Sequence, residues 1–233
     1  MSMHLKFWWR SASVAILAAL LNFSQTALAA GAQAPEQKDI PSQPSASAVA
    51  GHYHVDEQAS LLRFCVRRIP ATKVEGEFGN FRGDFDIPVQ SLEATVLNVE
   101  INTGSVDTGN RLINSVVTSK EFFSAKEHPE ISFHSSSIRL TGEHTAQLSG
   151  LLTIRGVTRP VSFEVNYTFD PVKPNEKGRT VSFNGELVIS RSEFVMKALS
   201  GIVSDKVRIM LSARAHSDQT SPPKPAEIAA DAS

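Results

Sequence analysis

Apolar and polar residues alternate with a period of two through most of the middle of the chain. Residues 161–169 are the clearest case, with Val, Phe, Val, Tyr and Phe at odd positions and polar residues between them from Ser162 to Thr168. Such alternation is typical of a β-strand with one apolar and one polar face. The polar second face indicates antiparallel pairing. The same pattern recurs at 62–66, 97–101, 146–154, 181–189 and 207–215, so we predict an all-β domain of antiparallel strands.

Turn signals at 141–143 and 175–178 separate these strands, and several short strands between turns are typical of a barrel or a sandwich. One short helix is predicted near 111–120, with Asp107 as a candidate cap, followed by an irregular loop over 122–129. The alternation does not distinguish a barrel from a sandwich. An eight-stranded barrel is just wide enough to be filled by side chains or by a ligand, and the pattern leaves both possibilities open.

The first 29 residues have the pattern of a secretory signal peptide. Lys6 and Arg10 precede an apolar run at 14–21, and Ala27-Leu28-Ala29 supplies small residues for cleavage. The alternative is an uncleaved membrane anchor. It is disfavoured because polar residues interrupt the apolar run well before the ~20 residues that a span needs. We therefore expect cleavage after Ala29, a periplasmic location and no transmembrane segment in the mature protein.

Composition divides the remainder of the chain into three parts. Residues 30–50 are rich in Ala, Pro, Ser and Gln and contain no aromatic residue, which predicts a flexible linker. Residues 217–233 predict a disordered tail for the same reason. The domain is then expected at 51–216.

The charge balance argues against polyanionic partners. The chain has 23 Lys and Arg against 24 Asp and Glu, and removing 1–29 takes away two bases and no acid, which leaves 21 − 24 = −3. No basic block appears along the sequence. We therefore expect no nucleic-acid partner and no strongly charge-driven membrane association. Cys65 is the only cysteine, so no disulfide forms within the chain.

A series of short motifs resembles one known family. The central motif is Leu-Thr-x-x-Gly-x-Thr-x-Pro-Val at 152–161, a signature of the YceI-like family. The other landmarks follow in family order, at 76–85 (Gly and Phe), 105–108 (Ser-Val-Asp-Thr), 122–133 (Phe-Phe, then His-Pro-x-Ile-x-Phe), 191–194 (Arg-Ser-x-Phe) and 203–209 (Val-x-Asp-x-Val-x-Ile). The resemblance implies a lipocalin-like, extended, eight-stranded β-barrel. It also implies export to the periplasm and binding of a polyisoprenoid or similar amphiphilic lipid in a tunnel, with no known reaction.

The resemblance turns the apolar strand faces into candidate tunnel-lining residues. They are Leu62, Phe64, Val66, Phe78, Phe81, Val99, Ile101, Phe133, Leu148, Leu152, Phe163, Val165, Phe183 and Phe194. Members often carry His-Ser near the first strand, a His after it, and Arg-Asp-x-His-Leu after the Ser-Val-Asp-Thr motif. This chain has Ala59-Ser60, Arg68 and Ile113-Asn114-Ser115-Val116-Val117 at those positions. The candidates to hold an anionic lipid head group instead are Arg67, Arg68 and Arg111.

The sequence offers little catalytic chemistry. It has neither a Gly-x-Ser-x-Gly elbow nor a phosphate-binding Gly-rich loop. His52 and His54 share a strand face, but no ligand cluster at recognisable spacing completes a metal site. We therefore expect a non-enzymatic lipid carrier with no catalytic residue, no metal and no cofactor other than a bound isoprenoid or quinone-like molecule. A lipid-modifying enzyme and a ligand-free structural or stress-response module remain alternatives, and a homodimer is compatible with the sequence.

Overall fold

The computed structural model describes residues 45–171 and 178–217. The predicted signal peptide, most of the predicted linker and residues 218–233 lie outside the described residues. None of the helices in the described ranges is long and apolar enough to cross a bilayer.

The described chain is mostly β-structure. The strands are β1 (Gly51–Val55), β2 (Leu61–Arg68), β3 (Thr72–Phe78), β4 (Phe81–Ile87), β5 (Val96–Asn102), β6 (Val106–Asp107), β7 (Glu130–Leu140), β8 (Thr145–Ile154), β9 (Val157–Phe169), β10 (Thr180–Ser190) and β11 (Val203–Ser217). The helices are α1 (Ala46–Val49) and α2 (Arg111–Thr118), with 3-10 turns η1 (Leu92–Ala94), η2 (Thr103–Ser105) and η3 (Arg191–Phe194). The predicted helix is therefore α2, and α1 is a single turn that the sequence pattern did not indicate.

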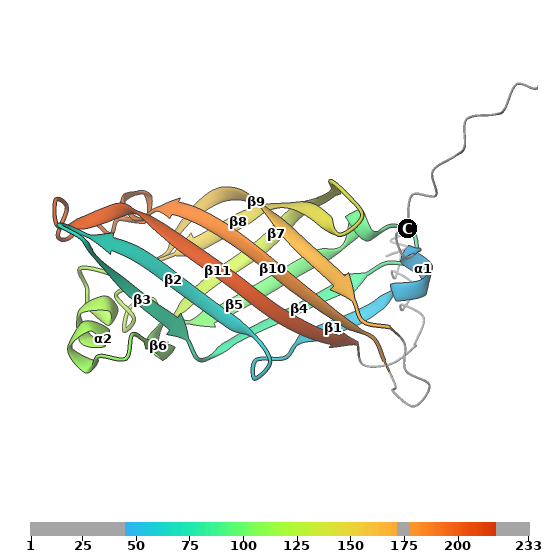
Figure 1. Ribbon diagram of the computed structural model, residues 1–233, viewed down its shortest axis with the longest axis horizontal. Helices are drawn as coiled ribbons and strands as arrows, with labels where there is room; N and C mark the ends of the chain where they lie inside the picture. Colours follow the sequence, from blue (N-terminus) through green and yellow to red (C-terminus); the bar gives the residue numbers. More distant parts are fainter. Residues whose placement is uncertain (1–44, 172–177, 218–233) are drawn as a thin grey trace, which may run out of the picture. The chain divides into compact units, whose positions relative to one another are not determined.

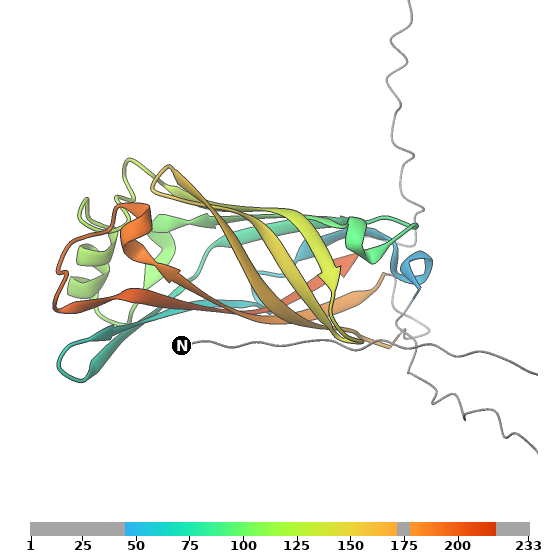
Figure 2. The same ribbon diagram turned by 90° about the horizontal axis from the view of Figure 1, so that it is seen from above.

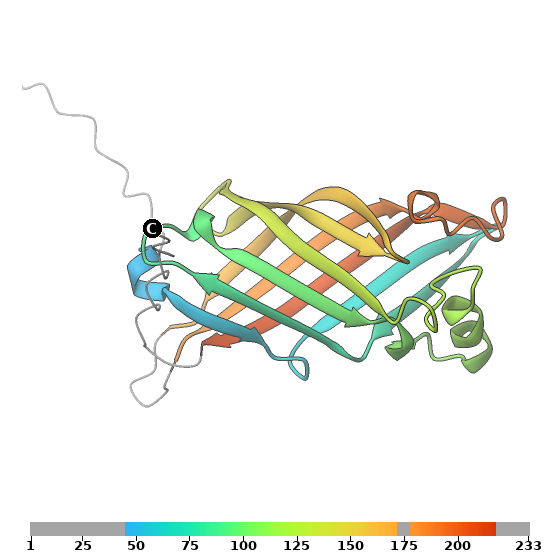
Figure 3. The ribbon, with the colours of Figure 1, turned by 180° about the vertical axis from the view of Figure 1, so that it is seen from behind.

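All strand pairings are antiparallel, and the sheet closes on itself. β1 and β2 both pair with β11 and lie end to end along it. β3 and β4 continue one another in the same way, and so do β5 and β6. With β7 to β11 this makes eight long strands, which confirms the predicted eight-stranded barrel. Figure 1 shows β2, β11 and β10 on one wall, and Figure 3, from behind, shows β1, β4, β5 and β7 on the opposite wall.

The two ends of the barrel differ. At one end lie α2, the β2–β3 hairpin tip and the segment between η3 and β11, as Figures 1 and 2 show. We call this end the mouth. At the other end α1 lies against the barrel, where the Tyr53 hydroxyl donates a 2.7 Å hydrogen bond to the Val49 carbonyl. Val49 and Tyr53 are both completely buried, so packed side chains lie at this end, which we call the closed end.

Burial follows the predicted alternation. On β9, Val165 and Tyr167 are buried whereas Asn166 and Thr168 are exposed. On β8 the whole even-numbered set from 146 to 154 is buried. The apolar faces therefore all point into the barrel, because this removes apolar area from water.

The wall is incomplete between β9 and β10. β10 pairs with β9 only from Val165 to Phe169, although β9 begins at Val157. Pro160 lies in the stretch that pairs with β8 alone. It lies inside β9, where that side of the strand has no hydrogen-bond ladder to complete, so the missing N–H donor costs little stability.

Two sequence-based boundaries and one helix cap need correction. Residues 46–49 of the predicted linker form α1, and Val49 is buried, so ordered structure begins before Gly51. Ser217 is the last residue of β11 rather than the first of a tail. The N-cap of α2 is Asn110, whose side chain accepts hydrogen bonds from the N–H groups of residues 112 and 113. Asp107 instead accepts hydrogen bonds from the Gly109 N–H and from the Asn114 side chain.

Candidate functional site

The barrel encloses one large cavity of about 570 Å³. It reaches from Ile87 and Phe169 near the closed end to Leu199 and Ile202 at the mouth. Its volume lies within the range of pockets that hold small organic ligands, roughly 300–1,000 Å³. The cavity therefore extends through the interior of the barrel from one end to the other.

Thirteen of the fourteen predicted tunnel residues line this cavity. They are Leu62, Phe64, Val66, Phe78, Phe81, Val99, Ile101, Phe133, Leu148, Leu152, Phe163, Val165 and Phe183. Phe194 does not line it, although its side chain is only 1% exposed. Phe194 is the last residue of η3, so it follows no strand alternation, and it packs in the core beside the cavity.

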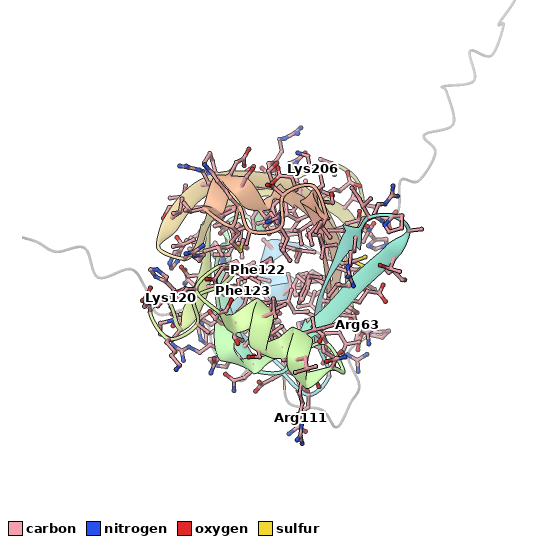
Figure 4. All side chains as sticks on the ribbon, turned by 90° about the vertical axis from the view of Figure 1, so that its left-hand side faces the viewer. Arg63, Arg111, Lys120, Phe122, Phe123 and Lys206 are labelled. Carbon is pink, nitrogen blue, oxygen red and sulfur yellow. The ribbon has the colours of Figure 1, made fainter. Side chains whose placement is uncertain are left out.

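The three candidate arginines separate according to strand geometry. Side chains on β2 alternate between the two faces of the sheet, so Arg67 points outward while Arg68 lines the cavity at the mouth. Arg111 is exposed at the first position of α2, and Figure 4 shows its side chain directed away from the mouth. Arg68 is therefore the only one of the three placed to contact a molecule inside the barrel.

The mouth is framed by α2 and the loop after it, a contribution that strand patterns did not reveal. Leu112, Ile113, Val116 and Val117 all line the cavity from α2. Their spacing of one, four and five residues puts them along one side of a helix, which is the signal that was available in the sequence. Phe122 and Phe123 follow and also line the cavity, and Figure 4 shows them near the centre of the mouth. The Phe123 ring lies 5.7 Å from that of Phe78 and 6.4 Å from that of Phe64, so these aromatic side chains connect the loop to the wall.

Hydrogen bonds around Asn114 attach α2 to the barrel. Its side-chain oxygen accepts from the Thr108 N–H at 2.8 Å and from the Thr108 hydroxyl at 2.6 Å. Its side-chain nitrogen donates to Asp107 at 3.0 Å. This bond, together with the Gly109 N–H, holds the pKa of Asp107 below its ordinary value of 3.8. Asn114 therefore has a structural role at the start of α2.

Arg191 is the second cation that lines the cavity, and unlike Arg68 it is buried and has a structural role. It is 4% exposed and lines the cavity. Its guanidinium donates to the carbonyls of Ala198, Val203 and Ser204 at 2.8 to 3.0 Å. Its donors are therefore used to hold the segment from η3 to β11 in place. The Arg-Ser-x-Phe motif contained this residue, but the sequence did not indicate that it would be buried.

The cavity offers almost no acid–base chemistry. Among the described residues that line it, only Arg68, Thr95, Tyr167 and Arg191 carry polar side-chain atoms. Burial raises the pKa of Tyr167, so its hydroxyl stays neutral, and it donates to the Glu143 carbonyl at 3.2 Å. No carboxylate, histidine or cysteine of the described chain faces this space. The arrangement is suited to holding an apolar molecule.

Comparison with known proteins connects this barrel to a group of bacterial proteins. Residues 53–215 match the family model described as the YceI-like domain. A UPF0312 protein of Ectopseudomonas mendocina is 29% identical over 167 residues, covering 71% of this chain and 87% of that protein. Protein YceI of Salmonella newport is 30% identical over 168 residues, covering 71% of this chain and 87% of the relative.

Two solved structures share the fold. The crystal structure of Burkholderia cenocepacia BcnA has a TM-score of 0.60 and 28% identity, and the match covers 69% of this chain and 98% of that one. A structure described as a polyisoprenoid binding domain from Saccharophagus degradans has a TM-score of 0.57 and 15% identity, covering 71% and 98%. The second likeness shows the fold alone.

Proposed function

Because the chain belongs to the YceI-like family, we propose that it carries one long apolar lipid, of the isoprenoid class, inside the barrel. The observation that carries this proposal is the cavity of about 570 Å³, whose lining is apolar from the closed end to the mouth. The isoprenoid class is named because the Saccharophagus domain with the same fold is described as binding polyisoprenoid.

The dimensions of the cavity favour a chain over a compact molecule. On β11 the lining runs from Val203 to Ala213, which is roughly 33 Å along the strand at about 3.3 Å per residue. Strands of a barrel tilt by about 35–45°, so the axial length is roughly 25 Å. Each buried methylene contributes about 0.8 kcal/mol before the cost of ordering the chain. A long hydrocarbon uses this length best.

The head group of the lipid would lie at the mouth. Val49 and Tyr53 are completely buried at the closed end, whereas Arg68 reaches the cavity from the opposite end. A guanidinium pairs well with a phosphate or carboxylate because it donates two parallel hydrogen bonds. An amphiphile with an anionic or strongly polar head is therefore the expected ligand.

We propose further that the chain acts in the periplasm after cleavage following Ala29. This rests on the signal pattern of residues 1–29, which lie outside the described part of the structure. Intact-mass measurement of the chain recovered from the periplasm tests it. A mass that includes residues 1–29 would contradict the cleavage.

The decisive experiment is native mass spectrometry of the chain purified from its own envelope, with organic extraction of any bound molecule. Stripped protein is then reloaded with a C40 polyprenyl phosphate, a C40 polyprenol, a C10 isoprenoid phosphate and a C16 fatty acid. We expect one C40 molecule per barrel and preferential retention of the phosphate. Absence of any co-purified lipid and of any uptake would refute the carrier function. Conversion of the added lipid to a new mass would favour an enzyme.

Within the same series, Arg68→Gln should reduce the preference for polyprenyl phosphate over polyprenol without preventing uptake of either. Arg67→Gln is the matched control, because the neighbouring side chain points outward. Equal effects of the two substitutions would exclude Arg68 as the head-group contact.

A further inference from the structure

Exposed apolar side chains gather around the mouth of the barrel. Six of the eleven large apolar residues that the described chain exposes lie in the three segments at that end. The β2–β3 tip contributes one, α2 two, and the segment between η3 and β11 three: Ile69 (54% exposed), Leu112 (79%), Val116 (48%), Val195 (55%), Leu199 (50%) and Ile202 (47%). We call this set the rim. Ile69 donates its backbone N–H to the Ile202 carbonyl at 2.7 Å, so two of the segments are directly joined.

Part of the rim is held in an unfavourable conformation. Val195 and Leu199 have φ angles of +62° and +54°, which L-residues with bulky side chains rarely adopt. Glycine or asparagine would relieve this cost and would also remove apolar surface from water. The Arg191 hydrogen bonds to the Ala198 and Val203 carbonyls keep the segment in this form. The positive φ angles and the exposed apolar side chains therefore both lower the stability of the fold, which points to a function for these side chains.

Lys and Arg outnumber acids in the segments that bear the rim. The mouth segments 66–74, 108–126 and 194–203 contain seven Lys and Arg residues and one acid, Glu121, and five further acids lie just outside them: Glu75, Asp107, Glu127, Glu193 and Asp205. Lys73 and Lys120 form ion pairs with Glu75 and Glu127 just outside these ranges. The other five make no ion pair with any residue that the structure describes: Arg67, Arg68, Arg111, Lys126 and Lys197. The three segments are far apart in the sequence, which is why no basic block is visible there.

We propose that the rim docks the barrel, mouth first, on the surface of an anionic phospholipid bilayer. Exposed apolar side chains surrounded by Lys and Arg are the combination by which proteins bind such interfaces. The cavity opens within the same ring, since Leu112, Val116, Leu199 and Ile202 belong both to the rim and to the cavity lining. A docked barrel would exchange its lipid with the bilayer without passing the chain through water. The lipid exchange rests on the proposed carrier function, whereas docking itself does not.

The test is flotation of the purified chain with vesicles of phosphatidylglycerol and phosphatidylethanolamine at 1:3, compared with pure phosphatidylcholine. The rim variant is Ile69→Ser/Val195→Asn, because neither side chain lines the cavity and asparagine tolerates the positive φ of Val195. The matched control is Val89→Asn/Val96→Ser, which removes two exposed apolar side chains at the closed end. Every variant keeps the residues before 45 and after 217 unchanged, so any contribution of those residues to vesicle binding is the same in all variants.

We expect the unchanged chain to bind the anionic vesicles, the rim variant to bind about tenfold more weakly, and the control to bind as the unchanged chain does. Arg67→Gln/Lys126→Gln should weaken binding and reduce its salt dependence, whereas Arg139→Gln near the closed end should not. Equal binding to neutral vesicles, equal losses in rim and control variants, or no binding at all would each overturn the proposal. If the chain bound an envelope protein through the rim but did not bind vesicles, the rim would be a protein-docking surface, and this result would also overturn the proposal.

Bound lipid per barrel, measured on the same variants, separates the two proposals. A rim variant that retains its lipid and loses the vesicles supports docking as an independent property. A chain that docks normally but carries no lipid refutes the carrier function and leaves the docking surface intact.

Discussion

Ala146→Phe distinguishes a hollow barrel from a filled one. Ala146 is 2% exposed and lines the cavity from β8. Its ladder partner is Val165, and Gly185 lies opposite Val165 on the next strand. On the other side Ala146 pairs with Leu140, which also lines the cavity, so Ala146 is a short side chain in this row and a larger one would extend into the cavity of about 570 Å³.

The two interpretations predict opposite signs for the change in stability. Burying a phenylalanine side chain is worth about 1.5–3 kcal/mol, so a cavity with free space should accept the ring with no loss of stability. In lipid-free protein we expect the free energy of unfolding to stay equal or to rise by up to about 2 kcal/mol. A core already filled by side chains would instead lose about 1–3 kcal/mol through overpacking.

The assay is urea unfolding of stripped protein, combined with mass spectrometry of the lipid-loaded form. Stripping matters because a bound ligand adds its own stabilisation to the folded state. Ala146→Phe should also shorten the usable tunnel and shift retention from C40 towards shorter chains. Gln147→Phe on the outer face of the same strand is the control and should retain C40 as the unchanged chain does. A loss above about 1 kcal/mol in the stripped Ala146→Phe protein would refute the hollow cavity.

Three further outcomes follow from the described contacts. Val165→Asp should lower the free energy of unfolding by several kcal/mol, because it buries an unpaired carboxylate, whereas Asn166→Asp on the outer face should change it by no more than about 0.5 kcal/mol; similar denaturant midpoints would contradict the inward orientation. The folded pKa of Asp107 is depressed, so its hydrogen bond from Asn114 stabilises the fold at pH values above the ordinary pKa of 3.8, and this stabilisation is lost as the pH falls through the folded pKa. Asn114→Ala should therefore return the pKa of the Asp107 carboxyl towards 3.8, which an NMR titration measures. A chain shortened to 51–216 lacks the buried valine of α1, so its free energy of unfolding, measured with urea, should be lower than that of the longer chain by about 1.5–3 kcal/mol; equal stability would show that α1 does not close the barrel.

The sequence by itself determined six of the eleven strands of the described chain, β2, β5, β8, β9, β10 and β11, and the direction of their faces. A period of two is a local property, because successive side chains on a strand point to opposite sides whatever the strand pairs with. Thirteen of the fourteen candidates chosen in this way line the cavity. Phe194 failed because it lies on a 3-10 turn, where that period does not hold.

The family motifs supplied the barrel and its closure, which alternation alone left open. They did not show that three short strands continue others end to end to make eight, since this depends on which residues pair across the sheet. Nor did composition place the start of the domain correctly. Val49 belongs to a segment rich in Ala and Ser, and only its contact with Tyr53 shows that it is part of the core.

Only the tertiary structure decided the character of the mouth. Arg67 and Arg68 are adjacent and chemically identical, and the register of β2 alone directs Arg68 into the cavity. The sequence shows no basic block, and only folding brings Lys and Arg from three distant segments to the same end of the barrel. Periodicity is set by neighbouring residues along the chain, whereas a ring of charge and exposed apolar surface is set by how the closed sheet places its loops.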